Sequence, residues 1–150
     1  MKKTHTTRRA MMAHSLALLG AGALAAPAAD AATATAGAWR VVFQVSDADP
    51  KKWGLTLNNV KNVQQELGAQ HIAVEIVVYG PGIGMLLAEA EIANRVIEAM
   101  QAGVAVLACE NTMRAQHLSR DDMIAKIGFV AAGVVQLIKR QAEGYAYIRA

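Results

Sequence analysis

The chain of 150 residues contains a single cysteine, Cys109, which therefore has no disulfide partner in its own chain. The sequence shows no pair of acid–base carboxylates, no metal-binding histidine cluster and no nucleophilic serine elbow. Internal repeats are absent as well. The usual signatures of hydrolases and metalloenzymes are thus missing, and the lone thiol is the main chemical feature of the chain.

The apolar stretch near the N-terminus is too short, and too interrupted by His14 and Ser15, to span a bilayer comfortably. It follows four basic residues without an acid and ends in small residues suited to a signal peptidase at 29–31. Residues 7–12 resemble a twin-arginine signal, although Met11 replaces the usual aromatic residue. We therefore predict a signal peptide over 1–31 and export to a bacterial periplasm, with a retained membrane anchor as the alternative.

Basic charge is concentrated in that leader. Residues 1–31 hold four of the 15 Lys and Arg and one of the 12 Asp and Glu, so the rest of the chain has 11 of each and a formal charge of zero. A phosphate-binding surface needs a basic cluster, and none remains. We expect no nucleic-acid partner, and membrane contact only through the leader before cleavage. The small residues of 32–38 predict a flexible linker.

From residue 39 onward, short β-branched runs alternate with amphipathic helical stretches. This alternation predicts an α/β fold, a three-layer α/β/α sandwich with a parallel sheet of roughly five strands. The near-continuous apolar character of 71–79 indicates a strand that is buried on both faces. Expected strands are 39–45, 71–79, 104–108, 129–131 and 145–148, and expected helices are 55–67, 85–100 and 133–143, with shorter ones starting near Asn111 and at 119–122.

The glycine-rich loop 80–84 invites comparison with loops that cradle phosphate. Its spacing matches neither the dinucleotide fingerprint nor the P-loop, and no Lys-Ser/Thr pair follows it. We expect no bound cofactor there and predict a tight connection that allows close approach of two backbone segments.

Cys109 ends a predicted strand and precedes a predicted helix, at the edge where parallel α/β sheets bind ligands. Backbone N–H groups at a helix start favour the thiolate, which can accept sulfur as a persulfide. Asp47, Asn111, Arg114 and His117 are the candidate neighbours that would tune it. A free cysteine is also often just a small, packed apolar residue, and that interpretation stays open.

Cys109, Met113 and His117 fall at positions i, i+4 and i+8, and these residue types bind copper and other soft metals. One helix face would spread them over about two turns, too far apart for all three to hold one ion. We expect no metal site, although a soft-metal binder remains a third alternative.

The segment 103–109, followed by a short helix, resembles the sulfur-accepting segment of the DsrE/DsrF-like (YchN-like) family. The stretches 113–122, 132–138 and 144–148 resemble an exported, stand-alone branch of that family. The resemblance spans 39–150. It implies a five-stranded parallel α/β/α domain, assembly into trimers or hexamers, and Cys109 in the position that carries a persulfide in relay members.

The resemblance leads us to expect a periplasmic sulfur carrier that exchanges sulfur with a donor or acceptor protein, rather than an enzyme with turnover of its own. Relay members work in the cytoplasm, some of them on transfer RNA, whereas this chain has a neutral domain behind an export signal. The alternative is an oligomeric protein that binds a small ligand without catalysis and whose cysteine is structural.

Overall fold

The computed structural model describes residues 39–150. The predicted signal peptide and linker lie outside these residues and stay predictions. Within 39–150, no helix is long and apolar enough to cross a membrane. The elements follow in the order β1 (Trp39–Val45), α1 (Pro50–Leu67), η1 (Ala69–His71), β2 (Ile72–Val78), η2 (Gly80–Leu86), α2 (Ala93–Gln101), β3 (Ala105–Cys109), α3 (Glu110–Ala115), β4 (Gly128–Val130), α4 (Gly133–Ala142) and β5 (Ala146–Arg149), where η marks a 3₁₀ helix.

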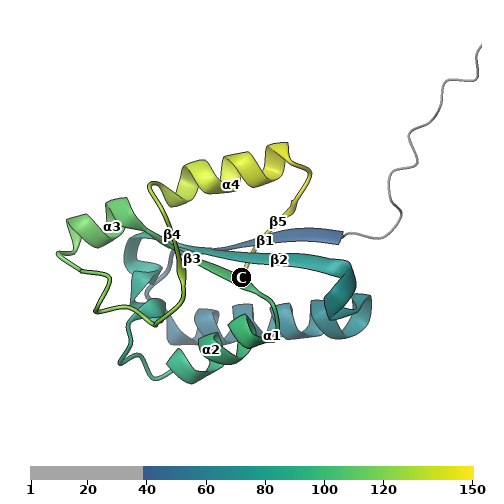
Figure 1. The fold of residues 1–150 in the computed structure, drawn as a ribbon, viewed down its shortest axis with the longest axis horizontal. Helices are drawn as coiled ribbons and strands as arrows, with labels where there is room; N and C mark the ends of the chain where they lie inside the picture. The colour runs from purple at the N-terminus through teal and green to yellow at the C-terminus, as the bar shows by residue number, and fades with distance from the viewer. Residues whose placement is uncertain (1–38) are drawn as a thin grey trace, which may run out of the picture. The chain divides into compact units, whose positions relative to one another are not determined.

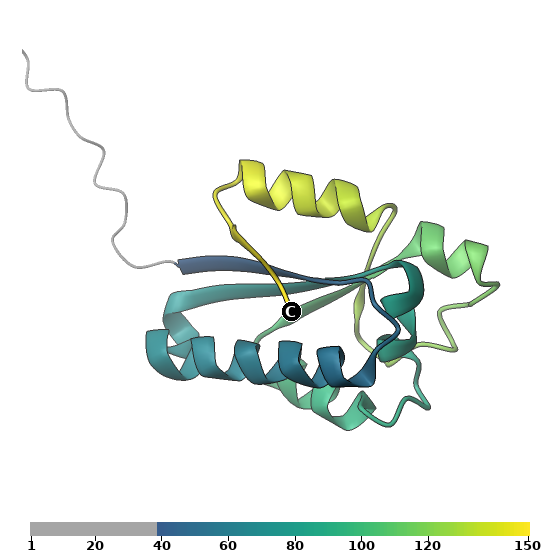
Figure 2. The ribbon, with the colours of Figure 1, turned by 180° about the vertical axis from the view of Figure 1, so that it is seen from behind.

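The five strands form one parallel sheet in the order β4-β3-β2-β1-β5. Helices α1 and α2 cover one face, and α4 lies across the other (Figures 1 and 2). The predicted three-layer α/β/α sandwich is therefore confirmed. Because every strand runs the same way, all their carboxyl ends meet at one edge of the sheet.

The central strand β2 is buried along most of its length, as its apolar run predicts. Its side chains alternate between a large cluster under α1 and α2 and a small one under α4. The small cluster consists of only three buried residues, Val42, Val77 and Leu137. Hydrophobic burial therefore holds α4 less strongly than it holds the opposite layer.

Helix α1 begins at Pro50, five residues before the predicted start. Asp49 caps it, because its carboxylate accepts a hydrogen bond from the Lys51 N–H at 2.9 Å. Proline suits the first helical position, where no hydrogen bond from its nitrogen is needed. Both signals stand in the sequence, so the prediction placed the start too late by relying on apolar spacing alone.

The helix predicted over 85–100 is wrong in its first half. The glycine-rich loop is itself the 3₁₀ helix η2, and α2 begins only at Ala93. Between them the chain pairs with a distant segment, since Leu87 bridges Met123 and the Ile124 N–H donates to the Leu86 carbonyl. This tertiary pairing outweighs the local helical spacing.

The helix predicted to start at Ser119 is also wrong, because 119–122 forms a turn. The Asp122 carboxylate accepts hydrogen bonds from both the N–H and the hydroxyl of Ser119, each at 2.7 Å. Ser119 and Asp122, which resembled a capped helix start, thus stabilise a turn by hydrogen bonds to each other.

The loop prediction for 80–84 is confirmed in its main point, the close approach of two backbone segments. A Cβ atom on Gly82 would lie 2.9 Å from the Val45 carbonyl oxygen and 3.0 Å from the Ser46 Cα. No side chain fits there.

A buried carboxylate adds specific polar contacts to the small apolar contact under α4. Glu75 on β2 is 3% exposed and lies beneath the helix. Its carboxylate accepts hydrogen bonds from Arg140 Nε at 3.0 Å, Arg140 Nη2 at 2.8 Å and Gln136 Nε2 at 2.9 Å. Both oxygens of the carboxylate are thus satisfied by side chains of α4.

We predict that Glu75→Ala lowers the free energy of unfolding by about 2–3 kcal/mol, because Arg140 would lose its partner inside the fold. Urea titration measures the change. Glu143→Ala is the matched control, since Glu143 binds the same arginine from a half-exposed position and should cost under about 0.5 kcal/mol. Equal effects of the two substitutions would contradict the prediction.

Candidate functional site

One row of residues marks the carboxyl edge of the sheet on the α4 side. Tyr79 and Cys109 directly follow the paired residues Val78 and Ala108 on β2 and β3. The two side chains are therefore neighbours on the same face. Tyr79 packs against the small cluster under α4, which confirms the face on which it lies.

Cys109 is the last residue of β3 and the cap of α3. It is 5% exposed and free of any disulfide. Its sulfur accepts a hydrogen bond from the Gly133 N–H, at the start of α4, at 3.3 Å. The backbone N–H groups of Thr112 and Asn111 and the Thr112 hydroxyl also lie close enough to lower the pKa of the thiol, while the Asn111 N–H itself donates to the Ala131 carbonyl at 3.1 Å. The sulfur thus lies among donors from two separate segments.

The Thr112 hydroxyl, which lowers the pKa of Cys109, is held in place by a second contact. Its oxygen accepts a hydrogen bond from the Gly80 N–H at 2.9 Å. A hydroxyl has one hydrogen to donate, and with its oxygen occupied by Gly80 that hydrogen is available to Cys109. The Gln116 side chain holds the other side of the same turn by donating to the Gly80 carbonyl at 3.3 Å.

These contacts decide the acidity of the thiol. Burial alone raises the pKa of Cys109, but the hydrogen bonds from Thr112, Gly133 and Asn111 together outweigh it, so the net pKa lies below the ordinary value. Thiolate is the nucleophilic form of cysteine. The site therefore favours a reactive sulfur in spite of its low exposure.

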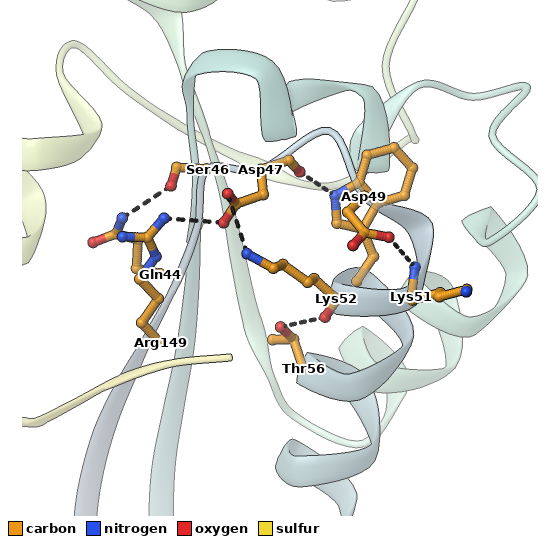
Figure 3. Close-up of polar contacts among 9 residues, drawn as sticks. Gln44, Ser46, Asp47, Asp49, Lys51, Lys52, Thr56 and Arg149 are labelled. Atoms are coloured by element: carbon orange, nitrogen blue, oxygen red, sulfur yellow. Dashed lines mark hydrogen bonds and ion pairs between the residues drawn. The ribbon is translucent and has the colours of Figure 1, made fainter.

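Asp47 lies at the same edge, but in a separate polar cluster (Figure 3). Its carboxylate binds Arg149 at 3.1 Å and Lys52 at 3.3 Å, and these hydrogen bonds lower its pKa. Among the residues that the structure describes, no hydrogen bond or ion pair joins Asp47 to Cys109. The structure thus places this candidate on a neighbouring cluster rather than on the sulfur.

Tyr79 lies between the two groups. Burial raises the pKa of Tyr79, with smaller contributions from Tyr147, Asp47 and Cys109, while Arg149 opposes them. Its phenol is therefore neutral at physiological pH. Tyr79 is within electrostatic range of both the thiol and the Asp47 cluster.

The three candidates that follow Cys109 are placed differently. The Asn111 side chain accepts a hydrogen bond from Arg114, and its backbone N–H donates to the Ala131 carbonyl at 3.1 Å, near enough to the sulfur to lower its pKa. Arg114 and His117 are exposed, and His117 has a left-handed backbone with φ of 55° after the end of α3. Within 39–150, no hydrogen bond or ion pair links either side chain to the sulfur.

The helix face that would align Cys109, Met113 and His117 does not form. Helix α3 covers only six residues, and Met113 is buried in the main core. Within the described part of the chain, no group of three or more His, Cys, Asp or Glu side chains could hold a metal ion.

Sequence reasoning missed three residues that shape the site, namely Tyr79, Thr112 and Gly133. Each carried a signal. Tyr79 ends the predicted strand 71–79, Thr112 is a hydroxyl residue three positions after the cysteine, and Gly133 opens a predicted helix. Their gathering around Cys109 depends on the strand order, which the sequence did not reveal.

Comparisons with known proteins agree with this geometry. The model of the DsrE/DsrF-like family matches residues 39–150. The chain belongs to the DsrE/DsrF-like family. This membership places it in a family of the sulfur-relay type, whose fold has the parallel sheet and helical layers described above.

Two solved structures are similar to this DsrE/DsrF-like chain. MTH1491 from Methanobacterium thermoautotrophicum, a protein of unknown function, is 35% identical, with a TM-score of 0.72 over 75% of this chain and 99% of its own. BT1422 from Bacteroides thetaiotaomicron, also of unknown function, is 13% identical, with a TM-score of 0.56 over 74% of this chain and 94% of its own, and it supports the fold alone. A comparison with curated proteins gave no match.

We predict that Thr112→Val makes the Cys109 thiol less acidic, because the isosteric side chain removes a donor to the thiolate. The rate of alkylation by iodoacetamide, followed against pH, should fall about tenfold at pH 7 and recover at high pH. Thr112→Ser keeps the hydroxyl and serves as the control. An unchanged pH midpoint in Thr112→Val would contradict the role of this hydroxyl.

Proposed function

We propose that this protein is a periplasmic sulfur carrier that holds sulfane sulfur as a persulfide on Cys109. The observation that supports it is the environment of this sulfur. A thiol at the carboxyl end of an interior parallel strand accepts a hydrogen bond from the Gly133 N–H, and nearby groups of Thr112 and Asn111 lower its pKa further. Membership of the DsrE/DsrF-like family supports the same chemistry.

The transfer step takes a hydropersulfide, R–S–SH, as the donor. The Cys109 thiolate attacks the outer sulfur, a new S–S bond forms, and the bond between that sulfur and R–S breaks. The electron pair leaves on R–S⁻, and the proton stays on the transferred sulfur until solvent removes it. The oxidation of the Cys109 sulfur is balanced by the reduction of the R–S sulfur of the donor, so the step needs no external oxidant and no redox cofactor. A thiol acceptor reverses it.

Low exposure shapes how this carrier would work. With Cys109 only 5% exposed, a donor must reach the sulfur past the segment that covers it. The Ala131 carbonyl lies 4.0 Å from the sulfur and the Gly133 N–H lies 3.3 Å from it, so the turn between β4 and α4 is that cover. Movement of this turn would admit a donor, and its return would shield the persulfide from oxidants and water.

The setting of the protein is part of the proposal. The basic leader and the neutral remainder of the chain support export and argue against a nucleic-acid partner. The carrier would then exchange sulfur with a donor or acceptor protein in the periplasm.

We predict that purified protein gains the mass of one sulfur atom, or about 32 Da, when it is incubated with glutathione hydropersulfide, because one thiolate accepts one sulfane sulfur. Intact mass spectrometry measures the gain, and dithiothreitol should reverse it. Cys109→Ser is the matched control and should gain nothing. If wild type takes up no sulfur, or Cys109→Ser takes up as much, the carrier function fails.

The same low exposure favours a second candidate, a non-catalytic oligomer that binds a small ligand and whose cysteine is only packed. The two are separated by labelling under native conditions. Alkylation that is quantitative only after unfolding supports the packed cysteine. Alkylation of the folded protein at pH 7, with a pH midpoint below that of a free cysteine peptide, supports the carrier.

We further propose a homo-oligomer, of the trimeric or hexameric kind that the resemblance implies. The outer face of α4 supports it, because three apolar side chains there are largely exposed: Val134 at 54%, Val135 at 45% and Ile138 at 60%. Removing such a patch from water would stabilise contact between subunits.

Light scattering at micromolar concentration should accordingly show an oligomer for wild type, and Ile138→Asp should shift it toward monomer, because a charge on the patch opposes burial. Leu55, an exposed apolar residue on α1, offers a matched control through Leu55→Asp, since it lies outside this patch. A monomeric wild type would overturn the proposal.

A further inference from the structure

Gly133, at the start of α4, packs so closely against the Tyr79 side chain that a larger residue would clash there. A Cβ atom on Gly133 would lie 2.9 Å from Tyr79 Cδ1, 3.0 Å from its Cβ and 3.1 Å from its Cγ. These distances are below normal carbon–carbon contact of about 3.5–4.0 Å. The contacts involve the base of the side chain, close to the backbone of β2, so a rotation of the ring alone cannot relieve them.

The same glycine supplies a donor to the sulfur. The Gly133 N–H reaches Cys109 Sγ at 3.3 Å, across 24 residues of sequence. It comes from α4, whereas the other groups that lower the pKa of the thiol belong to residues 111 and 112 on α3. The contact of Gly133 with Tyr79 therefore determines how close the start of α4 comes to the sulfur.

The helix cannot easily slide away to relieve a clash at its start. Its second half is tied to the sheet, since Arg140 and Gln136 both bind the buried Glu75 carboxylate. Relief at position 133 would therefore come from tilting the first turn away from the sheet. Cys109 lies next to this first turn, and its sulfur would lose the hydrogen bond from the Gly133 N–H.

We propose that Gly133 is a positioning residue for the Cys109 thiolate, because the missing side chain lets the first turn of α4 rest on Tyr79 with its N–H on the sulfur. This inference rests on the proposed function for its purpose, but it acts on the thiol before any sulfur is bound. A substituent at position 133 separates the donor from the sulfur and leaves the thiolate less stabilised.

The test is the pH dependence of Cys109 alkylation in Gly133→Ala. We expect the rate at pH 7 to fall about tenfold, with recovery at high pH, because loss of one donor to the thiolate makes the thiol less acidic. Alanine is otherwise the better helix former, so helix propensity does not account for such a loss. Gly54→Ala is the control, since a Cβ there meets only the flexible end of Arg95 at 3.4 Å.

Two further measurements protect the test against a variant that folds poorly. Tyr79→Ala in the Gly133→Ala background removes the two ring contacts and should restore part of the lost rate at pH 7. In the wild-type protein, the chemical shift of the Gly133 amide should change with pH at the midpoint of the Cys109 titration. In Cys109→Ser this pH-dependent change should disappear. Tyr79→Phe keeps the ring and should leave the pH midpoint where it is.

An unchanged midpoint in folded Gly133→Ala, or a Gly133 amide that ignores the titration of Cys109, would overturn the positioning role. These measurements use no sulfur donor, so they are independent of loading. A shifted midpoint in a protein that takes up no sulfur keeps the positioning role and rejects the carrier. Sulfur uptake together with an unshifted midpoint supports the carrier and rejects the positioning role.

Discussion

The placement of α4 on the sheet is the constraint from which the rest of the site follows. Within 39–150, only three fully buried apolar residues pack between this helix and the sheet, so the buried Glu75 carboxylate, bound by Arg140 and Gln136, sets where the helix docks. A buried ion pair adds little net stability compared with an apolar core, but it fixes geometry closely, since each partner is costly to leave unpaired. That geometry brings the start of α4 to Cys109.

Around Cys109, two local arrangements act on the same sulfur. One is short-range, because the cysteine stands at the N-cap of α3 and polar groups of Asn111 and Thr112 lower its pKa. The other is long-range, because Gly133 donates from α4 and Gly80 orients the Thr112 hydroxyl. Burial opposes ionisation of the thiol, and these donors together reverse its effect. Because the donors offset the effect of burial, the Cys109 sulfur can be shielded from solvent and still be acidic.

Much of the fold was predictable from the sequence. The apolar run of β2 identified a strand buried on both faces, and the alternation of strands and helices gave the parallel three-layer sandwich. The errors arose where distant segments interact. Residues 86–88 pair with 122–124 instead of continuing a helix, and Asp122 closes a turn with Ser119 instead of opening one. Periodicity describes only local preference, and tertiary pairing overrode it.

By itself, the sequence determined the fold class, the strand that carries the thiol, and the position of that thiol at the carboxyl edge, because hydrophobic periodicity and strand ends are local features. Only the tertiary structure decided which residues reach the sulfur. It moved Asp47 into a cluster with Lys52 and Arg149, and it brought Thr112 and Gly133 to Cys109. The reason is physical: hydrogen bonds between elements depend on strand order and on helix docking, and neither is encoded in the spacing of residues along the chain.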